Sequence, residues 1–207
     1  MDAEDAEGQD AERRLAALAA QSAACRACPL HQGRSRAVFA DGTAKARIFF
    51  VGEGPGADED RTGVPFVGRA GQLLTAIIER AMGLPRSAVY IANIVKCRPP
   101  GNRNPTKTEQ DACAPQFLAH QIRLVAPDIL IPLGKVAAQY LLGSELSMSR
   151  MRGRVWDHDG IPVVPTWHPA YLLRVPSAKR DTWDDIKLAL RTLGLDDSPA
   201  PWTGPST

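Results

Sequence analysis

The stretch RIFFVGEGPGADEDRTGVPFVGRAGQLL, residues 47–74, predicts a strand, a long loop and a helix in that order. An apolar, β-branched and aromatic run at residues 48–51 ends at Gly52, as is typical of a buried strand. Glycines, prolines and acids follow, and the helix begins near Arg69. Long loops in compact domains are usually functional, and ligands favour the strand-to-helix turns of parallel sheets. We therefore expect this loop to line a ligand site.

The rest of the chain repeats the alternation of strand and helix. Three further strands are predicted, at residues 89–95, 128–133 and 155–164, and the last of these is a hairpin. Five helices are predicted from apolar periodicity, caps and helix breakers, at residues 12–24, 69–82, 106–126, 134–143 and 178–193. Strands that alternate with helices predict an α/β protein, whose mostly parallel sheet is covered by helices on both faces.

The composition is that of a globular chain. Its 207 residues, 44% hydrophobic and 23% charged, suffice for one buried core. Residues 1–12 hold six acids and no base, so we expect a disordered acidic arm there, one domain at 13–195 and a loose tail at 196–207. The remainder is net basic, which suits a polyanionic partner but equally an ordinary solvated surface. No membrane-spanning run or signal-peptide pattern is found, so we expect a cytoplasmic protein without membrane contact, and a monomer.

The cysteines follow a spacing used by metal sites. A C-x2-C pair, Cys25 and Cys28, precedes Pro29, and Cys97 and Cys113 follow much later. In a reducing compartment these four thiols indicate a four-thiolate metal site. Scattered buried cysteines are the alternative, above all for Cys113, which lies within a predicted helix. Spacing does not separate zinc from an iron-sulfur cluster, because both accept four thiolates.

Polar side chains follow the predicted strands where each strand ends. They are Glu53 between Gly52 and Gly54, Asn93 with Lys96, Lys135 after Gly134, and Thr166, Trp167 and His168. Because the carboxyl ends of parallel strands meet at one edge, we expect an acid, an amide, an imidazole and two lysines on the same rim. Without a nucleophile in a tight turn, such a rim favours acid-base or electrostatic catalysis. The loop matches neither a phosphate loop nor a dinucleotide fingerprint.

Two of these side chains and one loop phenylalanine suit a nucleobase. Asn93 can donate and accept at once, as reading the amide edge of a base requires. Phe66 can stack on a base, and His168 can act as an acid, a base or a donor. Taken alone, each is more often structural: a strand-end amide, a core phenylalanine and a structural histidine. Their joint placement favours the functional interpretation.

Four separated motifs in order resemble one known family. They are GEGPGADEDRTGVPFVGRAGQLL at residues 52–74, NIVKCRPPGNRNPT at 93–106, LG at 133–134 and TWHPAYLLR at 166–174. Together with the cysteines, they resemble the family 4, iron-sulfur uracil-DNA glycosylases over about residues 25–193. The resemblance implies a three-layer α/β/α sandwich with a central four-stranded, mostly parallel sheet. It also implies an enzyme that flips uracil out of DNA and hydrolyses its N-glycosidic bond.

The resemblance also implies roles for the pocket residues. Phe66 would stack on the flipped uracil, Asn93 would bond its amide edge, and His168 would donate to the oxygen that becomes negative as the base leaves. Gly54 would line the uracil site. Glu53 would orient the attacking water or stabilise the cationic sugar. Better-known members of the superfamily carry an aspartate where this chain has Gly54, so it stays open whether Glu53 activates the water or only positions it.

Further residues are assigned to specificity and DNA contact. Glu59 is our candidate for the wall that excludes the 5-methyl group of thymine, with a solvated loop acid as the alternative. Leu172 is our candidate for the wedge that fills the vacated stack, with a core position as the alternative. Arg174, Lys135 and Arg98 are expected to contact DNA.

The four cysteines match the ligand positions of the family's 4Fe-4S cluster, which makes zinc the less favoured metal. Because hydrolysis transfers no electrons, we expect the cluster to be structural.

Two rival functions remain at this stage. One is a non-catalytic iron-sulfur protein that binds nucleic acid. The other is a relative that bonds covalently to the abasic site through a histidine in an inserted basic loop. Residues 96–108 hold no histidine and no such insertion, which favours turnover. The sequence leaves open whether single- or double-stranded DNA is preferred and whether hypoxanthine, xanthine or other bases are accepted.

Overall fold

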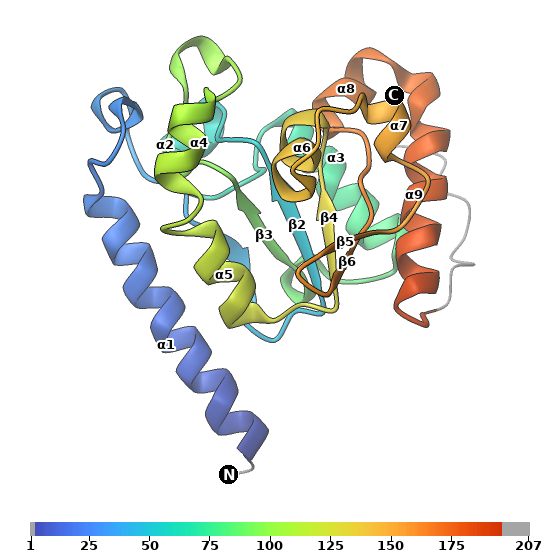
Figure 1. The fold of residues 1–207 in the computed structure, drawn as a ribbon, viewed down its shortest axis with the longest axis horizontal. Helices are drawn as coiled ribbons and strands as arrows, with labels where there is room; N and C mark the ends of the chain where they lie inside the picture. The colour runs from blue at the N-terminus through green and yellow to red at the C-terminus, as the bar shows by residue number, and fades with distance from the viewer. Residues whose placement is uncertain (1–2, 196–207) are drawn as a thin grey trace.

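The computed structural model describes residues 3–195, which form a sheet covered by helices on both faces (Figure 1). The strand order is β1-β3-β2-β4-β6-β5. The strands are β1 (Asp41–Gly42), β2 (Ile48–Gly52), β3 (Tyr90–Asn93), β4 (Ile129–Pro132), β5 (Trp156–His158) and β6 (Ile161–Val163). The four central strands are parallel, as predicted, whereas β1 and β5 pair antiparallel at the two edges. The four-stranded parallel core is therefore confirmed, and two short edge strands extend it.

The strand β2 divides the core between the two faces of the sheet. Phe49 and Val51 belong to one apolar cluster with residues of α1 (Ala3–Ala24), α5 (Leu118–Val125) and α6 (Lys135–Leu142). Ile48 and Phe50 belong to a second cluster with residues of α3 (Arg69–Ala76) and α9 (Lys179–Thr192). Because alternate side chains of a strand point to opposite faces, a continuous apolar run builds both halves of the core. The three-layer α/β/α sandwich is confirmed.

The α-helices of the described residues form the two outer layers, one on each face of the sheet (Figure 1). They are α1 (Ala3–Ala24), α2 (Ala57–Thr62), α3 (Arg69–Ala76), α4 (Lys107–Cys113), α5 (Leu118–Val125), α6 (Lys135–Leu142), α7 (Met148–Met151), α8 (Pro169–Arg174) and α9 (Lys179–Thr192). The helix predicted at 69–82 is α3 continued by a π-helical turn at Ile77–Ala81. The helix predicted at 106–126 is two helices, since the α-helical pattern is interrupted at residues 114–117.

The acidic N-terminal segment differs from its prediction. We expected residues 1–12 to be a disordered arm, but α1 begins at Ala3 and includes most of it. Alanine-rich sequence has high helix propensity, which favours a helix over this segment. Asp10 also lies 3.7 Å from Arg14, one turn later. The predicted tail at 196–207 lies outside the described residues. In the part of the chain that is described, no helix is long and apolar enough to cross a membrane.

The sheet brings the predicted strand-end residues together. Asn93 at the end of β3 pairs in register with Gly52 at the end of β2. Beyond β4 and β6, Leu133 bridges Thr166 in parallel, and the Gly134 amide donates to the Thr166 carbonyl at 2.8 Å. The carboxyl ends of all four parallel strands therefore meet at one edge.

Candidate active site

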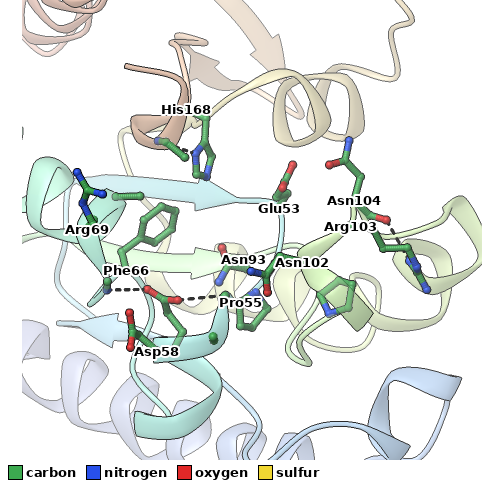
Figure 2. Close-up of a pocket in the computed structure, with 18 of the residues that line it drawn as sticks. Glu53, Pro55, Asp58, Phe66, Arg69, Asn93, Asn102, Arg103, Asn104 and His168 are labelled. Carbon is green, nitrogen blue, oxygen red and sulfur yellow. Dashed lines mark hydrogen bonds between the residues drawn. The ribbon is translucent and has the colours of Figure 1, made fainter. Parts of the chain in front are cut away.

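A cavity of about 640 Å³ lies at that edge (Figure 2). Seven of the residues assigned from sequence line it: Glu53, Gly54, Glu59, Phe66, Asn93, His168 and Arg174. The structure adds lining residues that the sequence analysis did not assign to a role, including Arg69, Asn102, Asn104 and Tyr171, and it brings Arg103, a candidate for phosphate contact, to the same cavity. All five lie inside the motifs quoted above, close in sequence to assigned residues, and that proximity was the signal available for finding them.

Asn93 presents a buried polar atom without a partner. Its residue is 1% exposed, and its Oδ1 accepts no hydrogen bond from the described residues. A Cβ added to Gly52 would lie 2.2 Å from this Oδ1 and 2.6 Å from Cζ of Phe66. Glycine at position 52 therefore lets the amide and the ring share one side of the cavity. Because an unsatisfied buried acceptor is unfavourable by about 1–3 kcal/mol, a ligand donor at this point is strongly favoured.

Phe66 is held in an unusual backbone conformation. Its φ of +53° lies in the left-handed region, which residues other than glycine rarely adopt. The next two amides, of Val67 and Gly68, both donate to Oε1 of Glu59 at 2.9 Å. A Cβ on Gly71 would lie 1.9 Å from the Phe66 carbonyl group, so only glycine allows this approach. These contacts present the ring to the cavity, with its centroid 5.7 Å from that of the His168 ring.

Glu59 therefore stabilises the loop. Besides the two amides above, its Oε2 accepts from the amide of Gly56 at 3.1 Å, so one carboxylate joins the two ends of the loop. The alternative of a solvated loop acid is wrong for Glu59, because the side chain is only partly exposed and hydrogen-bonded. Its predicted role as a wall against thymine stays a prediction.

His168 is oriented as a hydrogen-bond donor. It is the N-cap of α8, and its Nδ1 accepts from the amide of Ala170 at 3.1 Å. Burial lowers the pKa of His168 to about 4, and Arg174 adds to the shift. The neutral ring therefore carries its proton on Nε2, the atom left free for a ligand. A Cβ on Gly134 would lie 2.8 Å from the His168 Cβ, so the strand end beyond β4 supports the ring closely.

Glu53 lies directly after β2 and points into the cavity between His168 and Asn104 (Figure 2). Burial raises the pKa of its carboxyl. A Cβ on Gly54 would lie 2.9 Å from Cγ2 of Val95, which leaves little room for a side chain at that position. An aspartate at position 54 would require Val95 or the loop to shift. At the end of β2 it is therefore the carboxylate of Glu53 that faces the cavity.

The opposite wall is a loop fastened by an ion pair. Arg103 donates two hydrogen bonds to Glu109, at 2.7 and 2.8 Å, and Glu109 also accepts from the amide of Thr106 in a capping box. The hydrogen bond from Arg103 is the largest cause that lowers the pKa of Glu109 to about 2. Arg98 donates to Oδ1 of Asn102 at 2.7 Å, behind the cavity lining. This loop is thus rigidly attached to the start of α4.

Lys96 does not lie on the rim, which corrects the expectation of two rim lysines. It is 1% exposed, and its Nζ donates to the Asn93 carbonyl at 2.7 Å and to Oε1 of Gln121 at 2.6 Å. Its long side chain turns back from the strand end toward α5, which the sequence pattern did not reveal. Lys96 therefore supports Asn93 from behind the cavity. The other rim lysine, Lys135, is exposed at the start of α6 and does not line the cavity.

Leu172 is a core residue, which corrects its assignment as the wedge. It is fully buried and belongs to the cluster that includes Phe66 and Leu133. Residues 168–174 form a helix and its cap, and neighbours on a helix point about 100° apart. Leu173 therefore points outward and is 40% exposed. Tyr171 lines the cavity and stacks on Trp167, with ring centroids 4.6 Å apart.

The four cysteines converge on one small cavity between α1, α4 and the segment after β3. The alternative of scattered cysteines is therefore wrong. The sulfurs of the two buried cysteines accept hydrogen bonds. The Sγ of Cys97 accepts from Nη1 of Arg34 at 3.1 Å, and the Sγ of Cys113 accepts from the Lys96 amide at 3.4 Å. Such donors stabilise metal-bound thiolates, so the donor set fits a thiolate-ligated group. Within residues 3–195 no group of three or more His, Cys, Asp and Glu side chains is placed to hold a single metal ion.

These features define an α/β protein with a pocket for a planar polar ring. Residues 39–187 match the family model of the uracil DNA glycosylase superfamily. The type-4 uracil-DNA glycosylase of Thermotoga maritima is 48% identical over 169 residues, which is 80% of this chain and 87% of that protein. The type-4 enzymes of Sulfurisphaera tokodaii and Archaeoglobus fulgidus are 43% and 39% identical, over 79% of this chain and 77% and 85% of theirs. The chain belongs to the uracil-DNA glycosylase superfamily and, within it, to the type-4 family.

Proposed function

We infer that this protein is a DNA repair glycosylase that flips uracil out of DNA and hydrolyses its N-glycosidic bond, leaving an abasic site. The observation that carries this function is the Oδ1 of Asn93, which lies buried in the cavity beside Phe66 without a hydrogen-bond partner among the described residues. Uracil offers an N–H donor flanked by two carbonyl acceptors on one edge, which complements an amide that both accepts and donates. The similarity to type-4 uracil-DNA glycosylases supports the same substrate.

The proposed reaction uses three groups of the cavity. The uracil ring lies on Phe66 and is read by Asn93. As the glycosidic bond lengthens, negative charge builds on the uracil oxygen, and the Nε2 proton of His168 stabilises that charge without being transferred. Glu53, at the end of β2, orients the attacking water or stabilises the positive charge on the sugar. Glu59 holds Phe66 in place and is our candidate wall against thymine.

The proposed DNA surface surrounds the mouth of the cavity. Arg174 lines the cavity and is assigned to a phosphate. We assign the wedge that fills the vacated stack to the exposed Leu173 instead of the buried Leu172. Lys135 and Arg98 remain candidates for more distant phosphates. We also infer one domain over residues 13–195, acting as a monomer, and the cytoplasmic location stays a prediction.

We propose that Cys25, Cys28, Cys97 and Cys113 hold a 4Fe-4S cluster. The support is that all four thiols line one cavity and that the sulfurs of Cys97 and Cys113 accept N–H hydrogen bonds. The cluster would supply a rigid link between the N-terminal segment, the strand end after Asn93 and α4. The chain's own residues would perform the hydrolysis.

If the cluster is present, the purified protein will be brown, with absorbance at about 400 nm. Cys113→Ser should abolish that absorbance and lower both the melting temperature and the affinity for DNA. Ser22→Ala is the matched control, because Ser22 lines the same cavity and is 1% exposed but carries no thiol. A colourless protein with one zinc ion per chain would contradict the cluster and favour a four-thiolate zinc site.

The function is tested on single- and double-stranded oligonucleotides that carry one uracil. After alkali treatment, strand cleavage should occur at uracil and not at thymine or cytosine. Asn93→Ala should lower the excision rate by about 10- to 100-fold, since it removes hydrogen bonds inside a buried site. Retention of DNA without cleavage would favour a non-catalytic binding protein, and an adduct stable in denaturant would favour a covalent relative.

A further inference from the structure

Two acids on α9 contact the segment that leads into His168. Asp185 is fully buried, and its carboxylate accepts from Oγ1 of Thr166 at 2.9 Å, from Nε of Arg152 at 3.0 Å and from the amide of Gly153 at 3.1 Å. Asp181 lies one helical turn earlier. It accepts from Nε1 of Trp167 at 3.2 Å, and Nη1 of Arg152 lies 3.7 Å away. The two side chains that precede His168 are therefore each bonded to α9.

The backbone of the same segment is fixed from the sheet. The Thr166 amide donates to the Pro132 carbonyl at 3.1 Å, and the Thr166 carbonyl accepts from the Gly134 amide at 2.8 Å. Thr166 itself is 1% exposed. Together with the acids of α9, these contacts hold the segment from its main chain and from its side chains. His168 is the first residue beyond this double attachment.

Stability alone gives little reason for this network. A buried carboxylate paired with an arginine can often be replaced by apolar side chains without loss of stability, because desolvation of the charges offsets their attraction. Burial also raises the pKa of Asp185 to about 6, against the lowering effect of Thr166 and Arg152. The network does orient the chain, because its hydrogen bonds fix the side chains of the two residues that precede His168.

We propose that Asp185, supported by Asp181 and Arg152, is a positioning residue for His168 and thereby for the stabilisation of the leaving uracil. This proposal rests on the proposed function, uracil excision at this site. A donor that meets a developing charge must be placed closely, and a misplacement of about 1 Å can lower a rate by about 10²-fold. The helix α9, which contributes no residue to the cavity lining, would thus contribute to the chemistry.

The test compares two buried threonines. Thr166→Val removes the hydroxyl that donates to Asp185 and keeps the shape of the side chain. Thr182→Val is the matched control, because Thr182 lies in α9, is 2% exposed and has an Oγ1 with no partner among the described residues. Thr166→Val should lower kcat for uracil about tenfold and leave KM within about twofold, since positioning acts on the transition state. Thr182→Val should leave both constants unchanged.

A second substrate separates positioning from simple loss of folded protein. The fluorine of 5-fluorouracil withdraws electrons, so this base leaves as an anion more easily and depends less on the donor at His168. The defect of Thr166→Val should therefore be clearly smaller on 5-fluorouracil than on uracil. Equal defects on both bases, or no defect on uracil, would overturn the proposal while leaving uracil excision intact. Failure of the unmodified protein to release either base would instead overturn the proposed function and this proposal with it.

Discussion

His168→Ala is expected to lower the rate of uracil release by about 10²–10³-fold, the usual effect of removing one donor from a developing oxyanion. The structure gives the physical reason, because the His168 Nδ1 is occupied by the Ala170 amide and Nε2 is left to donate. KM should change little, since the bond strengthens only as the base leaves. Single-turnover kinetics on a uracil oligonucleotide measure the effect. His120→Ala, which removes an exposed histidine of α5, should match the unmodified protein.

The pH dependence of this effect follows from the pKa of His168, lowered to about 4 from the usual 6.5. The His168 ring is therefore uncharged at pH values near 7. The ratio of the unmodified rate to the His168→Ala rate should be constant between about pH 7 and 8, above the range in which Asp185, with a pKa of about 6, takes up a proton. The charging of His168 itself should change that ratio only as the pH falls through about 4. A change in the ratio centred near pH 6.5 that persists in Asp185→Asn would show that the ring is not held neutral.

The same pKa shift affects stability, with a defined sign. Between pH 6.5 and about 4 the unfolded chain binds a proton at His168 that the folded chain does not. The free energy of unfolding therefore contains a contribution that is fully present above pH 6.5 and is lost as the pH falls toward 4. Urea unfolding at pH 7 and pH 5 measures the effect. On going from pH 7 to pH 5, the unmodified protein should lose more of its free energy of unfolding than His168→Ala does.

Leu172→Ala is expected to lower the free energy of unfolding by about 2–5 kcal/mol, the range for removing a leucine from a packed core. Leu172 is fully buried in the cluster of α3, α9 and one face of the sheet, so truncation leaves a cavity. Urea unfolding followed by circular dichroism measures the loss. At a temperature where the variant is folded, it should excise uracil from single- and double-stranded DNA in the same ratio as the unmodified protein.

Leu173→Ala is the matched comparison, because Leu173 is the adjacent leucine and is 40% exposed. Its free energy of unfolding should change by no more than about 0.5 kcal/mol. If Leu173 fills the vacated stack, the variant should lose excision from duplex DNA and retain it on single strands. A duplex-specific defect in Leu172→Ala and none in Leu173→Ala would return the wedge to Leu172.

The parts of the site that could be predicted are those set by strand ends. Residues 48–51 are apolar without interruption, which indicates a strand buried on both faces, and the sheet follows from the alternation of such strands with helices. Because parallel strands align their carboxyl ends, Glu53, Asn93 and His168 could be expected at one rim from sequence alone. The structure brings all three to one cavity.

The direction of single side chains could not be predicted in the same way. Lys96 and Leu172 both lie in motifs of the rim, yet one turns back toward α5 and the other enters the core. A residue beyond a strand end no longer follows a simple period, so its orientation depends on partners such as Gln121 that are distant in sequence. Glu59 is a further case, since its carboxylate bonds amides eight and nine residues later.

The sequence by itself determined the fold class and the rim of the sheet, because residue period and strand ends are local properties of the chain. The cysteine spacing indicated a shared site for the four thiols, but their convergence was decided by the tertiary structure. The loop at residues 52–68 became a functional element only in the tertiary structure. There Glu59 closes it, glycines at positions 52 and 71 admit Phe66 and Asn93, and the acids of α9 hold the approach to His168. These effects depend on contacts between segments far apart in sequence, and only the folded chain decides them.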